Sequence, residues 1–347
     1  MKIAISTSGG DAPGLNAVIH AATRAAIVRG HTMVGLRHGF GALLAGEAPL
    51  ELDERSVAGI ERTGGTMLGG ASGGQPFGEA GTPGDVCRRL RDVGVDAIIM
   101  AGGDGTIRIA QEMAADGMAV VVVPKTIDRD VPETHTTFGF DTAVNTAAEA
   151  LDRLHSTAES HQRVMVMEVM GRDSGWIALH AGMGGGACAI LLPEFPFDPD
   201  VLTRHILARE AAGHSYHVLI CSEGAKPAGG AVQTSARTGK YGGIAEWIAT
   251  HLAETTGKDT RSVSLGHLLR GGAPSVRDRV LGLRFGSAAV SAVLRGDFGT
   301  MVAYVPPGFT TVPLERVAGR IRVVERATHE LRTATNMGIC FGTDALV

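Results

Sequence analysis

The chain lacks the features that mark several common classes of protein. Its 347 residues include four cysteines, and no two of them are spaced as a CxxC pair. Scattered thiols are typical of reduced proteins in the cytosol, so we expect a cytoplasmic location. No apolar run approaches the ~20 residues that span a bilayer. The first apolar run starts at Lys2, so we also expect no signal peptide and no membrane partner.

Clusters of basic charge, aromatic side chains and well-known phosphate motifs are also scarce. The formal net charge is −4, aromatic residues make up 4% of the chain, and no run of Lys and Arg occurs. The sequence therefore carries no electrostatic footprint for nucleic acid, and we expect no such partner. The first glycine-rich loop, which begins at Gly9, fits neither the GxxxxGK[ST] nor the GxGxxG pattern.

Glycine, by contrast, is abundant. The 49 glycines cluster in short loops that follow apolar runs. One helix is expected over about 16–28, and another from the Gly102–Thr106 loop to about 115. Strands are expected at 2–6, 96–101, 119–123, 164–169, 217–221 and 261–265. Alternating strands and helices predict an α/β fold with two Rossmann-like lobes, each a parallel sheet covered by helices. Apolar residues at helical spacing also predict a packing helix over 314–331.

The loop that follows the strand at 119–123 carries the most informative residues. It reads Pro124-Lys125-Thr126-Ile127-Asp128-Arg129-Asp130. It comes at the carboxyl end of a strand, where open α/β sheets bind ligands. One aspartate can accept a proton, the other can support a metal ion, and the lysine can face a phosphate. These are the groups that phosphoryl transfer to a hydroxyl requires.

Two glycine-rich loops add backbone donors for a phosphate chain. One contains Gly9-Gly10-Asp11, and the other reads Gly102-Gly103-Asp104-Gly105-Thr106. Each follows a strand and precedes a helix, and the N–H groups at a helix start can bind phosphate. Asp104 can reach Mg²⁺ directly or through water. Either loop alone could be a structural turn, but the presence of two favours a phosphate site.

Basic side chains lie at or beside several strand ends, and we expect them at one edge of a sheet. They are Arg163, Arg172, Arg261, His267 and Arg270. Arginine suits bidentate contacts with phosphate, so this group suggests a phosphorylated substrate. Glu223, which also follows a strand, would suit a sugar hydroxyl.

Longer segments make the pattern specific. They are Gly9–Ala17, Gly102–Thr106, Pro124–Asp128, Phe138–Ala143, Ala158–Arg163, Glu168–Arg172, Gly175–His180, Leu265–His267 and Arg270–Gly272. With these segments the chain resembles the 6-phosphofructokinases from Lys2 to Gly342. It is most similar to the actinobacterial-type group, which contains both ATP and pyrophosphate users. The resemblance implies a phosphofructokinase-like fold, with a donor-binding lobe at 1–139 plus 252–303 and a sugar-phosphate-binding lobe at 140–251 plus 304–347.

The resemblance also implies a role for each candidate residue. Asp128 would be the general base that takes the proton from the 1-hydroxyl of fructose 6-phosphate, with Thr126 beside it. Arg172 would stabilise the transferring phosphoryl group, and Asp104 would hold Mg²⁺. The donor ATP would lie along Gly10, Gly102, Gly103, Asp104, Gly105 and Thr106. Fructose 6-phosphate would contact Thr126, Ile127, Asp128, Met170, Gly171, Arg172, Glu223, His267 and Arg270.

Two further arginines imply an assembly. By the same resemblance, Arg163 and Arg261 would reach into the active site of a neighbouring subunit. The protein would then be a homo-oligomer, a dimer or a tetramer, with active sites shared between subunits.

Donor choice depends on Gly105 and Lys125. Pyrophosphate users of the family usually carry Asp at the position of Gly105, where a carboxylate would repel the α-phosphate of a nucleotide. Lys125 is typical of pyrophosphate users but also occurs in ATP enzymes of this group. We therefore predict ATP as the donor, with pyrophosphate as the alternative.

Three departures from the family pattern leave the acceptor open. Ser72, Arg129 and Leu269 stand where the family usually has Arg, Asn and Gln, and we hypothesise that Arg129 partly restores the charge lost at Ser72. Another ketose phosphate is an alternative acceptor, and a non-catalytic sugar-phosphate-binding homologue is an alternative of a different class. NAD kinases and diacylglycerol-type lipid kinases share the GGDGT segment but lack the other loops. In regulated relatives several basic residues line an effector site. Arg24 remains here, but His20 and Ala212-Gly213-His214 replace others, so the resemblance implies weak control by ADP and phosphoenolpyruvate.

Overall fold

The computed structural model describes residues 1–70, 76–78, 81–234, 239 and 241–344, which divide into two units. Unit 1 comprises Met1–Ile127, Val131–Thr142 and Arg270–Arg320. Unit 2 comprises Asp128–Asp130, Ala143–Leu269 and Ile321–Val347. The chain therefore passes between the units several times, and it does so once inside the loop 124–130.

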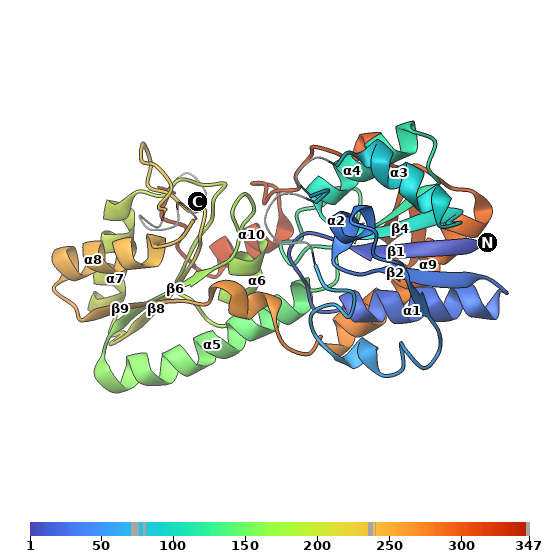
Figure 1. The fold of residues 1–347 in the computed structure, drawn as a ribbon. Helices are drawn as coiled ribbons and strands as arrows, with labels where there is room; N and C mark the ends of the chain where they lie inside the picture. The colour runs from blue at the N-terminus through green and yellow to red at the C-terminus, as the bar shows by residue number, and fades with distance from the viewer. Residues whose placement is uncertain (71–75, 79–80, 235–238, 240, 345–347) are drawn as a thin grey trace. The chain divides into compact units, whose positions relative to one another are not determined.

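In the described part of unit 1, seven strands form one sheet in the order β11-β10-β5-β4-β1-β2-β3 (Figure 1). They are β1 (Lys2–Thr7), β2 (Thr32–Leu36), β3 (Leu50–Leu52), β4 (Ala97–Gly102), β5 (Val120–Pro124), β10 (Thr300–Val305) and β11 (Gly308–Pro313). The edge pairs β2·β3 and β10·β11 are antiparallel, and the central strands are parallel. Because β1, β4 and β5 are parallel neighbours, the loops that follow them emerge at one edge of the sheet.

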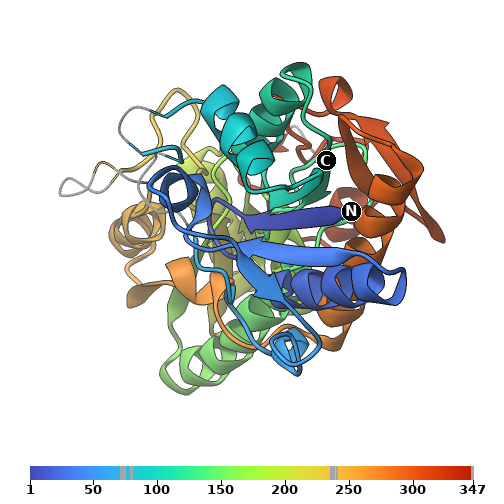
Figure 2. The same cartoon turned by 45° about the vertical axis from the view of Figure 1, so that its right-hand side comes forward.

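Helices cover both faces of this sheet. They are α1 (Leu15–Val28) and α9 (Val276–Arg295) on one face, and α2 (Gly39–Leu44), α3 (Pro83–Asp92) and α4 (Asp104–Ala115) on the other (Figure 2). Alternate residues of a strand point to opposite faces, so a doubly covered strand is apolar throughout. Ile3 and Ile5 of β1 accordingly pack with α1 and α9, whereas Ala4 packs with the other group of helices.

In the described part of unit 2, four parallel strands form a sheet in the order β7-β8-β6-β9. They are β6 (Val164–Val169), β7 (Ala189–Leu191), β8 (His217–Ser222) and β9 (Thr260–Ser264). The helices are α5 (Phe140–His161), α6 (Trp176–Gly184), α7 (Pro199–Ala211), α8 (Ile244–Thr256) and α10 (His329–Asn336). Helices α7 and α8 share a core with Val166 and Leu219 on one face, and α6 packs against Ile190 and Ile220 on the other.

The fold class predicted from the sequence is confirmed, because the described part of each unit is a sheet of mainly parallel strands covered by helices, with antiparallel strands at the edges in unit 1. The boundaries of the units differ from the predicted lobes. Residues 252–269 lie in unit 2, since β9 pairs with β6, and residues 304–320 lie in unit 1, since β11 pairs with β10. Within the described residues, no helix is both long enough and apolar enough to cross a membrane.

The packing helix predicted over 314–331 is wrong. Leu314–Arg316 forms a short 3₁₀ helix, Gly319 adopts a left-handed φ of 73°, and the next helix is α10. The N–H of Val324 donates to Glu194 Oε1 at 2.8 Å, so this backbone is satisfied by tertiary contacts. Of the apolar residues at this spacing, Leu314, Val317, Val324 and Leu331 are buried and Ile321 is 44% exposed, so the spacing reported burial at most of its positions, and not a helix.

Candidate active site

Three loops of unit 1 meet at the carboxyl edge of its sheet. The N–H of Ser8 donates to Ala101 O at 3.1 Å, which joins the loop after β1 to the end of β4. The N–H of Lys125 donates to Gly102 O at 2.9 Å, which joins the loop after β4 to the end of β5. In addition, Ser8 Oγ and Thr106 Oγ1 are 3.1 Å apart. The two glycine-rich loops and Lys125 are therefore direct neighbours.

Two cations flank the first glycine loop. Lys125 is only 4% exposed, and its Nζ donates to Gly10 O. Arg270 Nη1 donates to Asp11 O at 3.1 Å, and a Cβ on Gly10 would lie 3.0 Å from that nitrogen. Glycine at position 10 thus lets the guanidinium approach the loop. The structure puts Arg270 beside the first glycine loop, within unit 1.

The second glycine loop leads into helix α4. A Cβ on Gly102 would lie 2.0 Å from Thr106 Oγ1, so a larger residue would disrupt the loop. Gly105 differs, because it is exposed and no described atom lies within 4 Å of the place where its Cβ would be. The 12-residue helix α4 presents the N–H groups of its first turn and the positive end of its dipole. This arrangement suits a phosphate group.

Asp104 is the candidate ligand for magnesium. Its Oδ1 accepts from the N–H of Gly319 at 2.8 Å, and its Oδ2 is 2.9 Å from Arg108 Nε. Over the ranges that the structure describes, no three His, Cys, Asp or Glu side chains gather as a metal site. Magnesium is commonly bound by one or two carboxylates, with water and substrate phosphates as further ligands. One partly exposed carboxylate beside two phosphate loops fits a magnesium ion that arrives with its polyphosphate.

The loop 124–130 changes from unit 1 to unit 2 between Ile127 and Asp128. Before that point, Thr137 Oγ1 donates to Thr126 O at 2.8 Å within unit 1. After it, Ser174 Oγ donates to Asp128 O at 3.2 Å within unit 2. The candidate base, which is partly exposed, is therefore held through its own carbonyl by the loop that follows β6.

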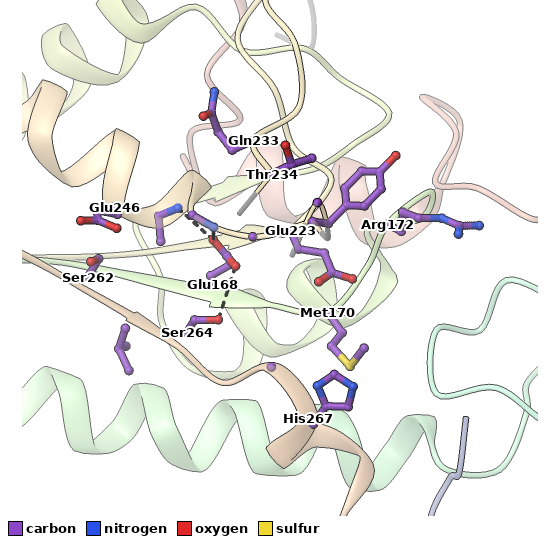
Figure 3. A pocket seen from close by; sticks show the side chains of 17 residues that line it. Glu168, Met170, Arg172, Glu223, Gln233, Thr234, Glu246, Ser262, Ser264 and His267 are labelled. Carbon is purple, nitrogen blue, oxygen red and sulfur yellow. Dashed lines mark hydrogen bonds between the residues drawn. The ribbon is translucent and has the colours of Figure 1, made fainter. Parts of the chain in front are cut away.

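Unit 2 has a cavity of about 1010 Å³ at the carboxyl ends of β6, β8 and β9 (Figure 3). The predicted side chains that line it are Met170, Arg172, Glu223 and His267. Gly171 lies between the first two with φ +139°, and a Cβ there would be 2.6 Å from Ser174 O. Glycine is therefore required at this turn. The cavity gathers residues from three loops that are far apart in the sequence.

Sequence reasoning missed the part that Glu168 plays in this cavity. Glu168 is 3% exposed, and its Oε2 accepts from the N–H groups of Gly243 and Ala245 at 3.0 and 3.1 Å. Its Oε1 accepts from Ser264 Oγ at 3.3 Å (Figure 3). One buried carboxylate thus caps the start of α8 and joins it to the end of β9. An acidic residue inside the otherwise apolar β6 was the available signal.

Other residues of the cavity wall gave no signal in the sequence. They are Gln233, Thr234, Tyr241, Glu246 and Ser262. The first three come from a segment that reads in the sequence as a polar surface loop, and its contribution to the cavity is decided by tertiary contacts.

The expectation that five basic residues share one sheet edge is wrong. Arg172 and His267 lie beyond the carboxyl ends of β6 and β9, whereas Arg163 and Arg261 lie at the amino ends of the same strands. Arg163 and Arg261 both pair with the carboxylate of Asp259. Arg270, the fifth basic residue, belongs to unit 1. Parallel strands keep their two ends at opposite edges, and six residues of β6 span about 20 Å.

Two of the three positions that depart from the family pattern lie in the described structure. Ser72 falls outside the described residues. Leu269 is fully buried, so it packs in a core. Arg129 Nη1 is 2.9 Å from His180 Nε2 and 3.5 Å from Glu330 Oε1. Because Glu330 balances its charge inside unit 2, this geometry does not support the hypothesis that Arg129 restores a phosphate-binding charge.

Comparison with known proteins agrees with this geometry. The family model described as phosphofructokinase matches residues 2–293. An ATP-dependent 6-phosphofructokinase of Chloroflexus aggregans is 44% identical over 99% of this chain and 98% of its own. A pyrophosphate–fructose 6-phosphate 1-phosphotransferase of Amycolatopsis methanolica is 46% identical over 95% of this chain and 98% of its own. Relatives with either donor in their name are thus about equally similar.

Solved structures have the same fold. The phosphofructokinase of Pichia pastoris in the T-state has a TM-score of 0.82 and 30% identity, covering 97% of this chain and 36% of the yeast chain. This chain therefore spans about a third of that longer protein. A pyrophosphate-dependent phosphofructokinase of Marinobacter aquaeolei has a TM-score of 0.82 at 21% identity, covering 99% of this chain and 90% of its own. The chain belongs to the phosphofructokinase family.

Proposed function

We propose that the protein is an ATP-dependent 6-phosphofructokinase of glycolysis. It would transfer the γ-phosphoryl group of ATP to the 1-hydroxyl of fructose 6-phosphate, giving fructose 1,6-bisphosphate and ADP. The observation that carries the proposal is the loop 124–130. Its Lys125 is packed against the glycine loop of unit 1, and Asp128, three residues later, is held by the sugar-side loop of unit 2. Family membership supports the same conclusion.

The chemistry follows from these groups. Asp128 takes the proton of the 1-hydroxyl while the hydroxyl oxygen forms a bond to the γ-phosphorus. The bond from that phosphorus to the β–γ bridging oxygen breaks, and ADP leaves with the electron pair. Arg172 suits the charge on the transferring group, since a guanidinium stays protonated at physiological pH and can make bidentate contacts with phosphate. Bound magnesium would be held by Asp104 with the donor's phosphates and would neutralise part of their charge.

The cavity of unit 2 would bind the sugar phosphate. Met170, Gly171 and Arg172 follow β6, Glu223 follows β8, and His267 follows β9. Glu223 can accept hydrogen bonds from sugar hydroxyls, and His267 and Arg172 can bind the anionic end. Thr126 and Ile127 precede the base in the same loop and would complete the contacts with the acceptor.

Arg163 and Arg261 support a shared active site in a homo-oligomer. They lie at the amino edge of the sheet of unit 2, and the cavity lies at its carboxyl edge. About 20 Å of strand is farther than an arginine side chain reaches. We therefore propose that these two arginines serve the cavity of a neighbouring subunit, in a dimer or a tetramer.

The choice of ATP as donor rests on the open space at Gly105. Gly105 is exposed at the start of α4 with open space around it, which leaves room for the α-phosphate of a nucleotide. Pyrophosphate is the second candidate, because a relative of that name is 46% identical. Lys125 suits either donor.

Initial rates of the purified protein with Mg²⁺ and fructose 6-phosphate, measured in parallel with ATP and with pyrophosphate, test the proposal. Formation of fructose 1,6-bisphosphate with ATP is the expected result. Turnover with pyrophosphate alone would overturn the donor. Absence of product with both would favour another ketose phosphate as acceptor, and absence with those as well would favour a protein that binds sugar phosphate without catalysis.

A further inference from the structure

Arg129 has an unusual backbone conformation for its residue type. Its φ of 55° lies in the left-handed region, which long side chains rarely adopt and which asparagine adopts more readily. Arg129 is also buried, with 7% exposed. A strained residue of this kind persists where the surrounding structure holds it in place, and it is a reason to look for function.

The side chain of Arg129 is held by three groups of unit 2. Its guanidinium carbon is 4.8 Å from the centre of the Trp176 ring, and that of Arg322 is 5.0 Å from the same centre. Arg129 Nη1 is 2.9 Å from His180 Nε2 and 3.5 Å from Glu330 Oε1. Trp176 and His180 belong to α6, and Glu330 belongs to α10. Cation–π contacts and a partly buried ion pair together fix the guanidinium.

The backbone on both sides of Arg129 is held by neighbouring parts of the same unit. Ser174 Oγ donates to Asp128 O at 3.2 Å, and the N–H of Arg322 donates to Asp130 O at 2.7 Å. Trp176 Nε1 in turn donates to Arg322 O at 3.3 Å. Each of the three residues 128–130 is therefore tied to unit 2, and Arg129 supplies the side-chain anchor.

We propose that Arg129 is a positioning residue, which anchors the loop of the general base Asp128 to α6 and α10 and acts on the reaction through Asp128 alone. The proposal rests on the proposed function. A general base must lie within about 3 Å of the proton that it takes. A displacement of about 1 Å costs on the order of 100-fold in rate. Loosening the anchor should therefore lower kcat and leave the binding of fructose 6-phosphate nearly unchanged.

The first test is Arg129→Asn, because asparagine tolerates the left-handed backbone and removes every contact of the guanidinium. We expect kcat to fall by about 10- to 100-fold, with the KM for fructose 6-phosphate within about two-fold of the parent. The matched control is Arg209→Asn. Arg209 also donates to a histidine of unit 2, from its Nε to His217 Nδ1 at 3.4 Å, and it lies away from the loop. This control should keep kcat within about two-fold.

Glu330→Gln is the second test, and it keeps the proposal falsifiable if Arg129→Asn folds poorly. We expect a smaller loss of kcat, since the stacking on Trp176 remains. If both residues act through one contact, the double variant should lose little more than Arg129→Asn alone. A kcat for Arg129→Asn within about two-fold of the parent would overturn the proposal, as would an equal loss in Arg209→Asn.

Hydrogen exchange separates failure of this inference from failure of the proposed function. The Arg322 amide, which donates to Asp130 O, reports directly on the anchor. It should exchange faster in Arg129→Asn and Glu330→Gln, and at the parent rate in Arg209→Asn, whether or not the parent phosphorylates fructose 6-phosphate. Unchanged exchange in both anchor variants would overturn the anchor itself.

Discussion

The two units present their candidate binding residues by different means. Unit 1 offers main chain: two glycine loops and the start of α4, with Lys125 and Arg270 beside them. Unit 2 offers side chains, which line a cavity and are oriented by other buried groups such as Glu168. Backbone donors suit a polyphosphate, which looks the same along its length. Side chains suit a sugar, whose hydroxyls must be distinguished. From this difference we expect activity to depend more on single side chains in unit 2, and more on the open space around glycine backbone in unit 1.

The largest effect is expected at the base, which unit 2 holds. Asp128→Asn keeps the size of the side chain and removes its capacity to take a proton. We expect kcat to fall by about 10²- to 10⁴-fold, with little change in the KM for fructose 6-phosphate. Steady-state rates with ATP measure this. A loss below about ten-fold would mean that another group is the base.

How well the sequence predicted each unit follows from the same difference. The loops of unit 1 were predictable, because glycines such as Gly102 stand in the sequence wherever the backbone must approach a phosphate or a neighbour. In unit 2, Glu223 and His267 were singled out because they follow strands, and Met170 was added by the resemblance to known kinases. The cap made by Glu168 could not be predicted, since its partners Gly243 and Ser264 lie about 75 or more residues away in the sequence.

The failed predictions have two causes. The predicted strands at 164–169 and 261–265 already placed Arg163 and Arg261 at amino ends, and grouping these residues with Arg172 and His267 overlooked that parallel strands keep their two ends at opposite edges of a sheet. Arg163 precedes β6 and Arg172 follows it, and this short separation in sequence places them at opposite edges. The helix expected at 314–331 failed because apolar spacing reports the burial of single residues such as Leu314 and Val324, which irregular chain can also bury.

The second effect tests the side-chain support of unit 2. Glu168→Gln removes the charge that accepts from three donors around the cavity. We expect the free energy of unfolding to fall by about 2 kcal/mol, since hydrogen bonds to charged groups contribute about 1.5–3 kcal/mol. The KM for fructose 6-phosphate should also rise. Glu254→Gln, at the exposed far end of α8, is the control and should change neither quantity. Equal behaviour of the two variants would remove Glu168 from the account.

Two buried groups, one in each unit, should respond to pH in opposite directions. In unit 1, burial raises the pKa of Asp278 to about 6, despite hydrogen bonds from Thr142. An acid whose pKa is raised in the folded state stabilises the fold while it is protonated, and this contribution is lost as pH rises through about 6. In unit 2, burial lowers the pKa of His217 to about 4. A base whose pKa is lowered in the folded state contributes stability above its unfolded pKa, and that contribution is lost as pH falls from about 6.5 towards 4.

Urea unfolding of the parent, Asp278→Asn and His217→Gln at pH 5 and pH 7 measures this. Between pH 7 and pH 5, the free energy of unfolding of the parent should rise by about 1 kcal/mol relative to that of Asp278→Asn. Over the same range it should fall by about 2 kcal/mol relative to that of His217→Gln. Shifts of the same sign for both variants would contradict the contrast between Asp278 and His217.

The smallest effect concerns a surface of unit 1. His20 Nδ1 is 2.7 Å from Val57 O and 3.5 Å from Glu61, and Arg24 is 3.6 Å from Glu54. Acidic neighbours disfavour an anionic effector at this place. We expect a hyperbolic dependence of rate on fructose 6-phosphate, with millimolar ADP changing half-saturation by less than about two-fold, where allosteric couplings are typically five-fold or more. A sigmoidal curve that ADP makes hyperbolic would refute this.

The central claim is that open space at Gly105 in unit 1 selects the donor, and the most direct measurement compares kcat/KM for ATP and for pyrophosphate in the parent and in Gly105→Asp. A Cβ at position 105 would meet no described atom within 4 Å, so the fold should tolerate the substitution. Gly308→Asp is the control, because it adds a carboxylate to unit 1 at another open position, at the start of β11. We predict that the parent and the control use ATP, and that Gly105→Asp loses about 100-fold or more with ATP while pyrophosphate becomes the better donor. A parent that turns over pyrophosphate and not ATP, or a Gly105→Asp variant that keeps its rate with ATP, would contradict the account.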